Sequence, residues 1–277
     1  MILRFKRLIS QIIFFFSANL GLKLGGVFPG VTTGFCYPFF YCHACPTASA
    51  ACPLRSIEIG VYRSNWNWRL ILYPILIIGF VGIISGRAVC GWACPIGLFQ
   101  RVTGKVAKKI KKKYPIAQKI GQLRIEPFFR YIKYLAFIGL VVATPILIGF
   151  MFTDVCPIGY LVGTIPISIL NPGEFTPNEF FYIAIVVFVL FIILVFLIER
   201  GWCRYFCPIG AMLAPFNKIS LYKVTVNKDE CIHCNICANE ACPMGIDVPN
   251  MDRDPECILC GKCIEACPKH IISFERG

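Results

Sequence analysis

Cysteine is the residue type in this chain whose number and spacing can do chemistry. The chain has 17 cysteines in 277 residues, and eight of them form two strings near its C-terminal end. The first string reads Cys231-x2-Cys234-x2-Cys237-x4-Cys242-Pro, and the second reads Cys257-x2-Cys260-x2-Cys263-x3-Cys267-Pro. A C-x2-C-x2-C triplet supplies three thiolates to a [4Fe–4S] cluster, and in two-cluster ferredoxins the fourth thiolate comes from the other string.

The two strings therefore predict two [4Fe–4S] clusters that exchange their fourth ligands. The first cluster is expected on Cys231, Cys234, Cys237 and Cys267, and the second on Cys257, Cys260, Cys263 and Cys242. The alternative is zinc, but structural zinc sites use paired C-x2-C units rather than triplets that end in Cys-Pro. The first string is one residue longer than usual before its last cysteine, so we expect a bulged turn there.

Four further cysteines lie in two similar segments, residues 86–97 and 200–210. Each segment reads C-x3-C-P-I-G and has an arginine three residues before its first cysteine. Together they offer four thiolates, enough for a third [4Fe–4S] cluster, and the two arginines would offset its negative charge. The expected ligands are Cys90, Cys94, Cys203 and Cys207, with Arg87 and Arg200 beside the cluster. The alternative is a set of reduced structural cysteines in tight turns.

A fourth set of cysteines repeats this count in the remaining loops. Its members are Cys42, Cys45, Cys52 and Cys156, with Cys36 as a spare. They predict either a fourth [4Fe–4S] cluster or disulfides, because a loop outside the cytoplasm can meet an oxidising environment.

Histidine and glycine patterns exclude several other chemistries. None of the three histidines lies in a long apolar run, and no C-x-x-C-H string occurs, so we expect no haem. His43, between Cys42 and Cys45, is a polar loop residue or a contact for a quinone. Neither a phosphate-binding loop nor a dinucleotide fingerprint is present. The chain is therefore expected to carry electrons as a subunit rather than to be the catalytic subunit of a complex.

The rest of the sequence must position these cysteines, and it is strongly apolar. The hydrophobic residues make up 57% of the chain and the charged residues 16%, against about 25% charged residues in a typical soluble domain. A helix needs about 20 apolar residues to cross a membrane. Four runs approach this length, and the first is interpreted as an uncleaved span rather than a signal peptide. The runs are Leu8–Phe28, Leu70–Ser85, Tyr134–Phe152 and Phe180–Ile198.

These runs predict a mainly α membrane protein with four transmembrane helices in a pseudo-repeat. Residues 1–216 are expected to form this membrane domain, which has cysteine–proline motifs at both faces. From residue 217 onward the apolar runs stop, and residues 217–277 are expected to form a small α+β ferredoxin domain with two [4Fe–4S] clusters.

The charges of the loops predict the orientation of the chain in the membrane. Residues 101–133 contain eleven Lys or Arg and one acid, whereas residues 153–179 contain no Lys or Arg. Because cytoplasmic loops are rich in Lys and Arg, the N-terminus, this basic loop and the ferredoxin domain are expected in the cytoplasm. The net charge of +13 then indicates contact with anionic lipid rather than with nucleic acid.

With these motifs, the sequence resembles the NapH/NosR/MauN-type membrane polyferredoxins. The motifs that carry the resemblance are the two C-x3-C-P pairs and the eight ferredoxin cysteines, and the resemblance covers essentially the whole chain. It implies electron transfer between a quinone pool or cytoplasmic donor and a partner oxidoreductase, or a role in maturing a metalloenzyme. The set Cys42, Cys45, Cys52 and Cys156, whose loops are expected on the outer side of the membrane, looks like an anaerobe variant of the group; these are called the outer cysteines below.

Three functions follow as hypotheses. The first is a membrane-bound subunit that passes electrons between redox partners in the cytoplasm and outside. The hydrocarbon core is about 30 Å thick, so a quinone, another cofactor or a partner subunit must carry electrons across it. A re-entrant segment at residues 160–170 would shorten this distance. The second is an accessory reductase or an assembly or regulatory protein for a metalloenzyme, whose outer cysteines cycle between thiol and disulfide. A transporter is disfavoured because no apolar run carries paired acidic residues.

Overall fold

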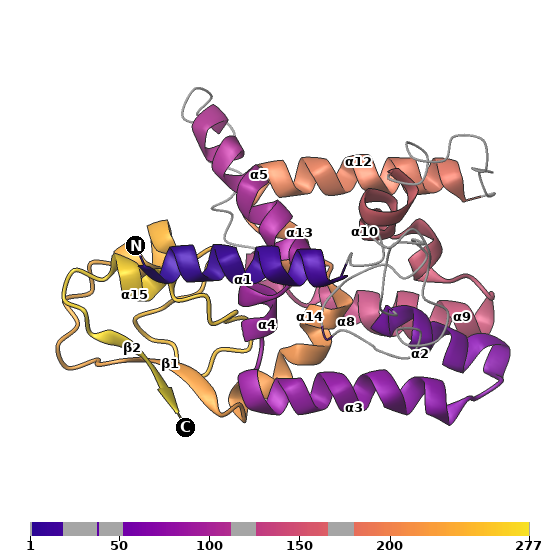
Figure 1. Ribbon diagram of the computed structural model, residues 1–277, viewed down its shortest axis with the longest axis horizontal. Coiled ribbons are helices and arrows are strands. Elements are labelled where there is room, and N and C mark those ends of the chain that lie inside the picture. Colours follow the sequence, from indigo (N-terminus) through magenta and orange to yellow (C-terminus); the bar gives the residue numbers. More distant parts are fainter. Residues whose placement is uncertain (1, 19–37, 39–51, 112–125, 166–179, 277) are drawn as a thin grey trace.

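The computed structural model describes residues 2–18, 38, 52–111, 126–165 and 180–276. These residues form a mainly helical protein in which one two-stranded sheet lies close to the C-terminus (Figure 1). The N- and C-terminal ends of the chain lie at the same end of the molecule, next to this sheet (Figure 1).

Long apolar helices run along the long axis of the molecule. They are α1 (Ile2–Ala18), α3 (Trp68–Ser85), α12 (Phe181–Leu197) and a continuous helix made of α8 (Ile132–Ala136), the π-helical segment η3 (Phe137–Ala143) and α9 (Thr144–Leu147). Within the described ranges, α3 is the one helix long and apolar enough to cross a membrane, and Ile132–Leu147 and Phe181–Leu197 are shorter apolar helices. Two of these helices, α3 and α12, coincide with predicted spans to within two residues, whereas Ile132–Leu147 ends five residues before the end of the predicted span Tyr134–Phe152. Helix α1 covers the start of the first predicted span, Leu8–Phe28, and residues 19–28 lie outside the described part.

The sequence repeat is also a structural repeat. In the first half, α3 is followed by α4 (Ala88–Trp92) and α5 (Pro95–Lys111). In the second half, α12 is followed by α13 (Gly201–Tyr205) and α14 (Pro208–Leu213). Each short middle helix has five residues with a cysteine at its third position, so the two halves place their cysteine pairs in the same local setting.

Short helices connect these longer elements. They are α2 (Pro53–Val61), η2 (Tyr62–Ser64), α7 (Glu126–Phe129), η4 (Phe152–Val155), α10 (Pro157–Gly159), η5 (Tyr160–Thr164) and η6 (Pro215–Lys218). The expected re-entrant segment, residues 160–170, begins as the helix η5, and its part after residue 165 lies outside the described residues.

The C-terminal region has the α+β composition that the cysteine strings predict. Strand β1 (Tyr222–Val226) pairs antiparallel with β2 (Ile272–Arg276), and Val224 lies opposite Phe274. The first string contains the π-helical turn η7 (Cys237–Ala241), whereas the second contains the ordinary α15 (Lys262–Ala266). The expected bulged turn is thus confirmed, because a π turn holds one residue more than an α turn.

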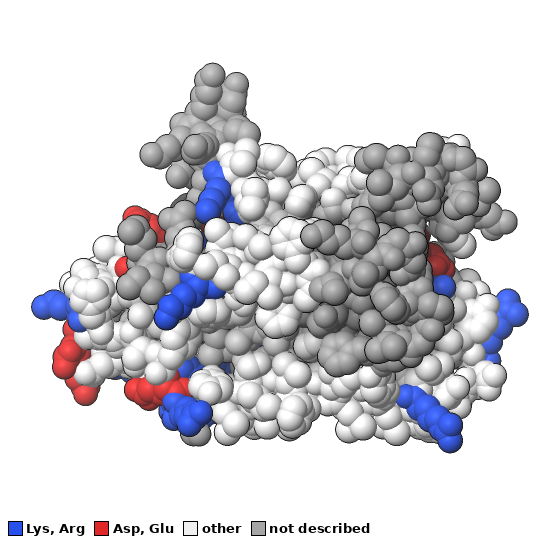
Figure 2. All heavy atoms as spheres, in the orientation of Figure 1, with Lys and Arg blue, Asp and Glu red and all other residues white. Residues whose placement is uncertain are grey.

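Apolar side chains both fill the interior and cover much of the outside. A single core cluster runs from the two C-x3-C-P segments, residues 86–97 and 200–210, into the C-terminal region. These two segments are called the paired motifs below. On the outer faces of α3 and α12, Leu76, Phe80 and Leu190 are 66%, 68% and 59% exposed. On the face drawn in Figure 2, the charged side chains gather towards the two ends, and uncharged residues occupy the described part between them. Such broad apolar surfaces normally mark contact with lipid or with another protein.

Candidate iron–sulfur sites

The Cys-Pro pairs place their cysteines where a helix begins. Cys52, Cys156 and Cys207 have extended backbone and precede helices whose first residue is proline. Proline disfavours helical geometry in the residue before it and has no N–H to leave unpaired. The Cys207 sulfur accepts a hydrogen bond of 3.4 Å from the Gly210 N–H. The motif therefore places each of these cysteines at the start of a helix, and the Cys207 sulfur caps the helix that follows it.

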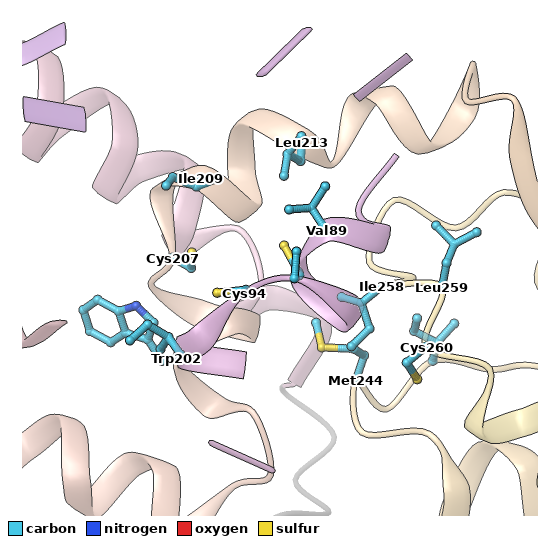
Figure 3. Packing of buried hydrophobic residues seen from close by; sticks show 14 of the residues in the cluster. Val89, Cys94, Trp202, Cys207, Ile209, Leu213, Met244, Ile258, Leu259 and Cys260 are labelled. Carbon is cyan, nitrogen blue, oxygen red and sulfur yellow. The ribbon is translucent and has the colours of Figure 1, made fainter. Parts of the chain in front are cut away.

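The structure brings together the four cysteines of the paired motifs. Cys90, Cys94, Cys203 and Cys207 are each 6–7% exposed. Burial, and after it the charges of Cys90 and Cys203, raise the pKa of the Cys94 thiol to about 12. Figure 3 shows Cys94 and Cys207, one from each half of the repeat, side by side. Four thiolates in so small a buried space require positive charge beside them.

Two buried arginines supply such charge and cross between the halves. Arg87 from the first half donates to the Cys203 carbonyl at 3.3 Å, and Arg200 from the second half donates to the Cys90 carbonyl at 2.9 Å. The glycines of the two Pro-Ile-Gly sequences make room for them. A Cβ on Gly97 would lie 3.3 Å from Arg200 Nη1, and one on Gly210 would lie 2.9 Å from Arg87 Nη2.

A glutamine that the sequence analysis did not single out also reaches this site. The Gln100 side chain is fully buried on α5, and its Nε2 donates to the Cys203 sulfur at 3.2 Å. Its position six residues after Cys94 is the only signal of this role in the sequence, and that signal is weak. Gln100 gives the site a neutral donor to sulfur in addition to the arginine charges.

The spacing of these sulfurs differs from that of a site for one ion. Among the described residues, no three His, Cys, Asp or Glu side chains lie close enough to hold a single metal ion. A [4Fe–4S] cluster binds each of its four cysteines through a different iron, so its ligands stand farther apart than those of one ion. Four buried sulfurs with arginines around them fit a cluster of this kind.

In the C-terminal region, two cavities match the predicted ligand sets. One is lined by Cys231, Cys234, Cys237 and Cys267 among mostly apolar residues. The other is lined by Cys242, Cys257, Cys260 and Cys263. Each cavity therefore takes three cysteines from one string and one from the other, which is the exchange expected from the spacing. Ligation by these residues stays a prediction, and the donor sets fit [4Fe–4S] clusters.

At the far end of the molecule, the structure describes half of the predicted outer set. Cys52 and Cys156 are both buried, and Cys36, Cys42, His43 and Cys45 lie outside the described residues. The segments around the two described cysteines are joined by an Arg55–Asp154 ion pair of 2.7 Å. They are also joined by hydrogen bonds from Thr153 to the buried Glu58 carboxylate. A complete outer site stays a prediction.

A buried polar network fixes the C-terminal region against the paired motifs. Arg87 Nη1 lies 2.8 Å from a Glu256 oxygen, and Lys133 pairs with the other oxygen of the same carboxylate. Burial alone would raise the pKa of Glu256, but the two cations hold that pKa below its ordinary value. The sequence analysis missed this network, because an acid next to Cys257 resembles any acid on a ferredoxin surface.

The comparisons with known proteins agree with this geometry. A 4Fe-4S binding domain family, Fer4_5, matches twice, at residues 66–113 and 180–227, and a second 4Fe-4S binding domain family, Fer4, matches residues 253–273. The two matches of the first family cover the two halves of the repeat. The uncharacterized protein MJ0750 of Methanocaldococcus jannaschii is 30% identical over 209 residues, which are 74% of this chain and 78% of that relative.

Named relatives give the family its identity. The ferredoxin-type protein NapH of Haemophilus influenzae is 24% identical over 80% of this chain and 74% of its own length. The regulatory protein NosR of Stutzerimonas stutzeri is 28% identical over 72% of this chain, which spans 27% of NosR. The chain belongs to the NapH/MauN/NosR/YccM polyferredoxin family. As a polyferredoxin of this family it is a ferredoxin-type iron–sulfur electron transport protein that binds [4Fe–4S] clusters. No solved structure matches this polyferredoxin.

Proposed function

We propose that the chain is a membrane-bound electron-transfer subunit with four spans and up to four [4Fe–4S] clusters. Two clusters lie on the C-terminal strings, one on the paired motifs, and one on Cys42, Cys45, Cys52 and Cys156. When bound, such clusters take up and release one electron at a time at potentials set by charge, hydrogen bonds and burial. The observation that carries the proposal is the meeting of four buried cysteines, two from each half of the repeat, directly beside the second string.

The site formed by Cys90, Cys94, Cys203 and Cys207, called the inner site below, is lined by residues that suit a negatively charged group. Arg87 and Arg200 bring two positive charges and bind the carbonyls of the opposite half. Gln100 directs an N–H at one sulfur. Burial keeps water away, so that the charges act in a medium of low dielectric constant and their effect on potential is large.

Membrane insertion is supported by the exposed apolar faces and by the loop charges. Helices α3 and α12 expose large apolar side chains, and lipid is the partner that would cover both. The excess of Lys and Arg in residues 101–133 favours placing the paired motifs and the C-terminal region on the cytoplasmic side.

The partners follow from the two ends of this arrangement. A cytoplasmic donor or acceptor exchanges electrons with the C-terminal clusters, and a quinone or another redox subunit continues the path through the membrane and to the outer side. The second candidate is an accessory or regulatory protein that delivers reducing equivalents to thiols, which the name of NosR as a regulatory protein favours. In that case the outer cysteines cycle between thiol and disulfide and hold no iron.

Counting iron on anaerobically purified full-length protein tests the proposal. With four irons in each cluster, about sixteen irons are expected for the electron-transfer subunit, and about eight for the regulatory alternative. The change Cys203→Ser should remove about four irons, because it takes a thiolate from the inner set. The matched control is Cys36→Ser, which removes the spare cysteine and should leave the count unchanged. An iron content of about eight that neither variant alters would contradict the inner cluster.

A further inference from the structure

One residue of the first motif lies against the backbone of the second cysteine string. Gly91 stands between Cys90 and Cys94, and a Cβ placed on it would lie 2.5 Å from the Ile258 carbonyl oxygen. The same Cβ would lie 3.5 Å from Cα and Cβ of Cys260. Any side chain at position 91 would therefore push the two segments apart. Figure 3 shows Ile258 and Cys260 approaching the motif from the C-terminal region.

This close approach is held by a row of hydrogen bonds to backbone carbonyls within residues 254–259. Asn217 Nδ2 donates to the carbonyls of Asp254, Pro255 and Cys257 at 3.0, 3.2 and 2.7 Å. The Trp92 indole N–H donates to the Leu259 carbonyl at 2.9 Å.

Two arginines add charged contacts at the ends of this row. Arg87 donates to the Pro255 carbonyl at 3.1 Å and pairs with Glu256. The buried Arg7 of α1 donates to the Cys260 carbonyl and lies 3.5 Å from Glu265.

We propose that Gly91 and the backbone of residues 257–260 form the electron crossing between the C-terminal region and the inner site. This inference rests on the proposed function and gives the order in which its cluster sites stand along the electron path. The set Cys242, Cys257, Cys260 and Cys263 is the proximal one, because its string touches Gly91, which lies between two inner ligands in α4. In each crossing, one electron leaves the proximal centre, which is oxidised by one unit, and the inner centre is reduced by one unit; no bond forms or breaks.

The other set of the C-terminal region is then the terminal one. Arg87, Trp92, Asn217 and Arg7 each bind a carbonyl within residues 254–260, whereas Cys234 is exposed and Ile232 is 60% exposed. A soluble redox partner can therefore approach the first string directly. The chain thus has a buried centre facing its own inner site and an open centre facing the cytoplasm.

The change Gly91→Ala tests the crossing in the full-length protein. We expect it to separate the two segments, to increase hydrogen exchange of the amides at residues 257–260 and to weaken the magnetic coupling between the reduced proximal and inner centres in electron paramagnetic resonance. Iron and sulfide contents should stay at the values of the unchanged protein. Gly139→Ala is the matched control, because nothing lies within 4 Å of a Cβ at that position.

A second variant keeps the test decisive if Gly91→Ala does not fold. Trp92→Phe retains an aromatic ring but removes the N–H that binds the Leu259 carbonyl, so it should increase exchange at the same amides. Hydrogen exchange reports this contact whether or not the inner set holds iron, so failure of the proposed function is seen separately, in the iron count. If both variants leave exchange and coupling as in the Gly139→Ala control, the proposed crossing is wrong.

Discussion

At the scale of single residues, the crossed arginines explain why the motif combines arginine, cysteine and glycine. Arg87 and Arg200 each bind a carbonyl in the half of the repeat to which they do not belong. Arg200 also reaches the Gly97 carbonyl at 3.4 Å, and a guanidinium can serve two such acceptors with one fixed charge, which the compact ammonium of lysine does less well. The glycines then supply the space that these side chains occupy.

Gln100 should tune the potential of the inner site. A donor to a ligand sulfur stabilises the more negative, reduced state more than the oxidised state, so Gln100→Leu should lower the potential of the inner centre. For a one-electron couple, about 59 mV corresponds to about 1.4 kcal/mol, so the loss of one hydrogen bond should lower it by tens of millivolts. Redox titration followed by electron paramagnetic resonance measures this shift.

The control for this prediction is another buried glutamine near the same motif. Gln11 Nε2 donates to the carbonyls of Gly91 and Cys94 at 3.1 and 3.4 Å, not to a sulfur. Gln11→Leu should therefore move the potential less than Gln100→Leu, while both variants keep their iron. Equal shifts in the two variants would show that packing, rather than the bond to sulfur, sets the effect.

At the scale of elements, the sequence predicts local geometry well where one residue type dictates it. The apolar runs give α3 and α12 nearly to the residue, and the extra residue of the first string gives the π turn η7. The predictions are weaker where the structure depends on contacts between distant elements. Nothing near Glu256 in the sequence indicates that Arg87 and Lys133, 169 and 123 residues away, would bury its charge.

The contact between α2 and η4 should depend on pH through Glu58. The pKa of this carboxyl is raised from 4.5 to about 7, mainly by burial and slightly by Asp154, although the Thr153 hydrogen bonds and the Arg55 charge lower it. Because the folded state favours the protonated form, the stabilisation is full below about pH 4.5 and is lost as the pH rises through about 7. The loss is on the order of 3 kcal/mol, since the pKa rises from 4.5 to about 7 and one pKa unit corresponds to about 1.4 kcal/mol.

Hydrogen exchange of the α2 amides, corrected for the intrinsic effect of pH, measures this dependence. Protection should fall between pH 5 and pH 8 in the unchanged protein, and Glu58→Gln should remove most of that fall. The control Glu230→Gln changes an exposed acid of the C-terminal region and should leave the fall in place. A pH dependence that survives Glu58→Gln would assign it to another group.

At the scale of the whole molecule, the structure places the cysteine sets along one axis. The C-terminal strings lie at one end (Figure 1), the paired motifs lie next to them, and Cys52 and Cys156 belong to the helices near the other end. The count of four cysteines in each set, and the exchange between strings, follow from sequence spacing. The order of the sets in space does not, because it depends on which carbonyls Asn217, Trp92 and Arg7 bind across the fold.

Labelling from each side of the membrane tests this axis as an orientation. Helix α5 begins at Pro95, directly after an inner cysteine, and ends at Lys111 among basic residues. If the paired motifs face the cytoplasm, a thiol introduced by Lys111→Cys should react with an impermeant reagent only from the cytoplasmic side. A thiol introduced by Asn171→Cys, in a loop without Lys or Arg, should react only from outside. Labelling is compared with the unchanged chain, whose own cysteines set the background, and with permeabilised membranes. The opposite pattern would place the basic loop outside and would reverse the side from which every redox partner approaches.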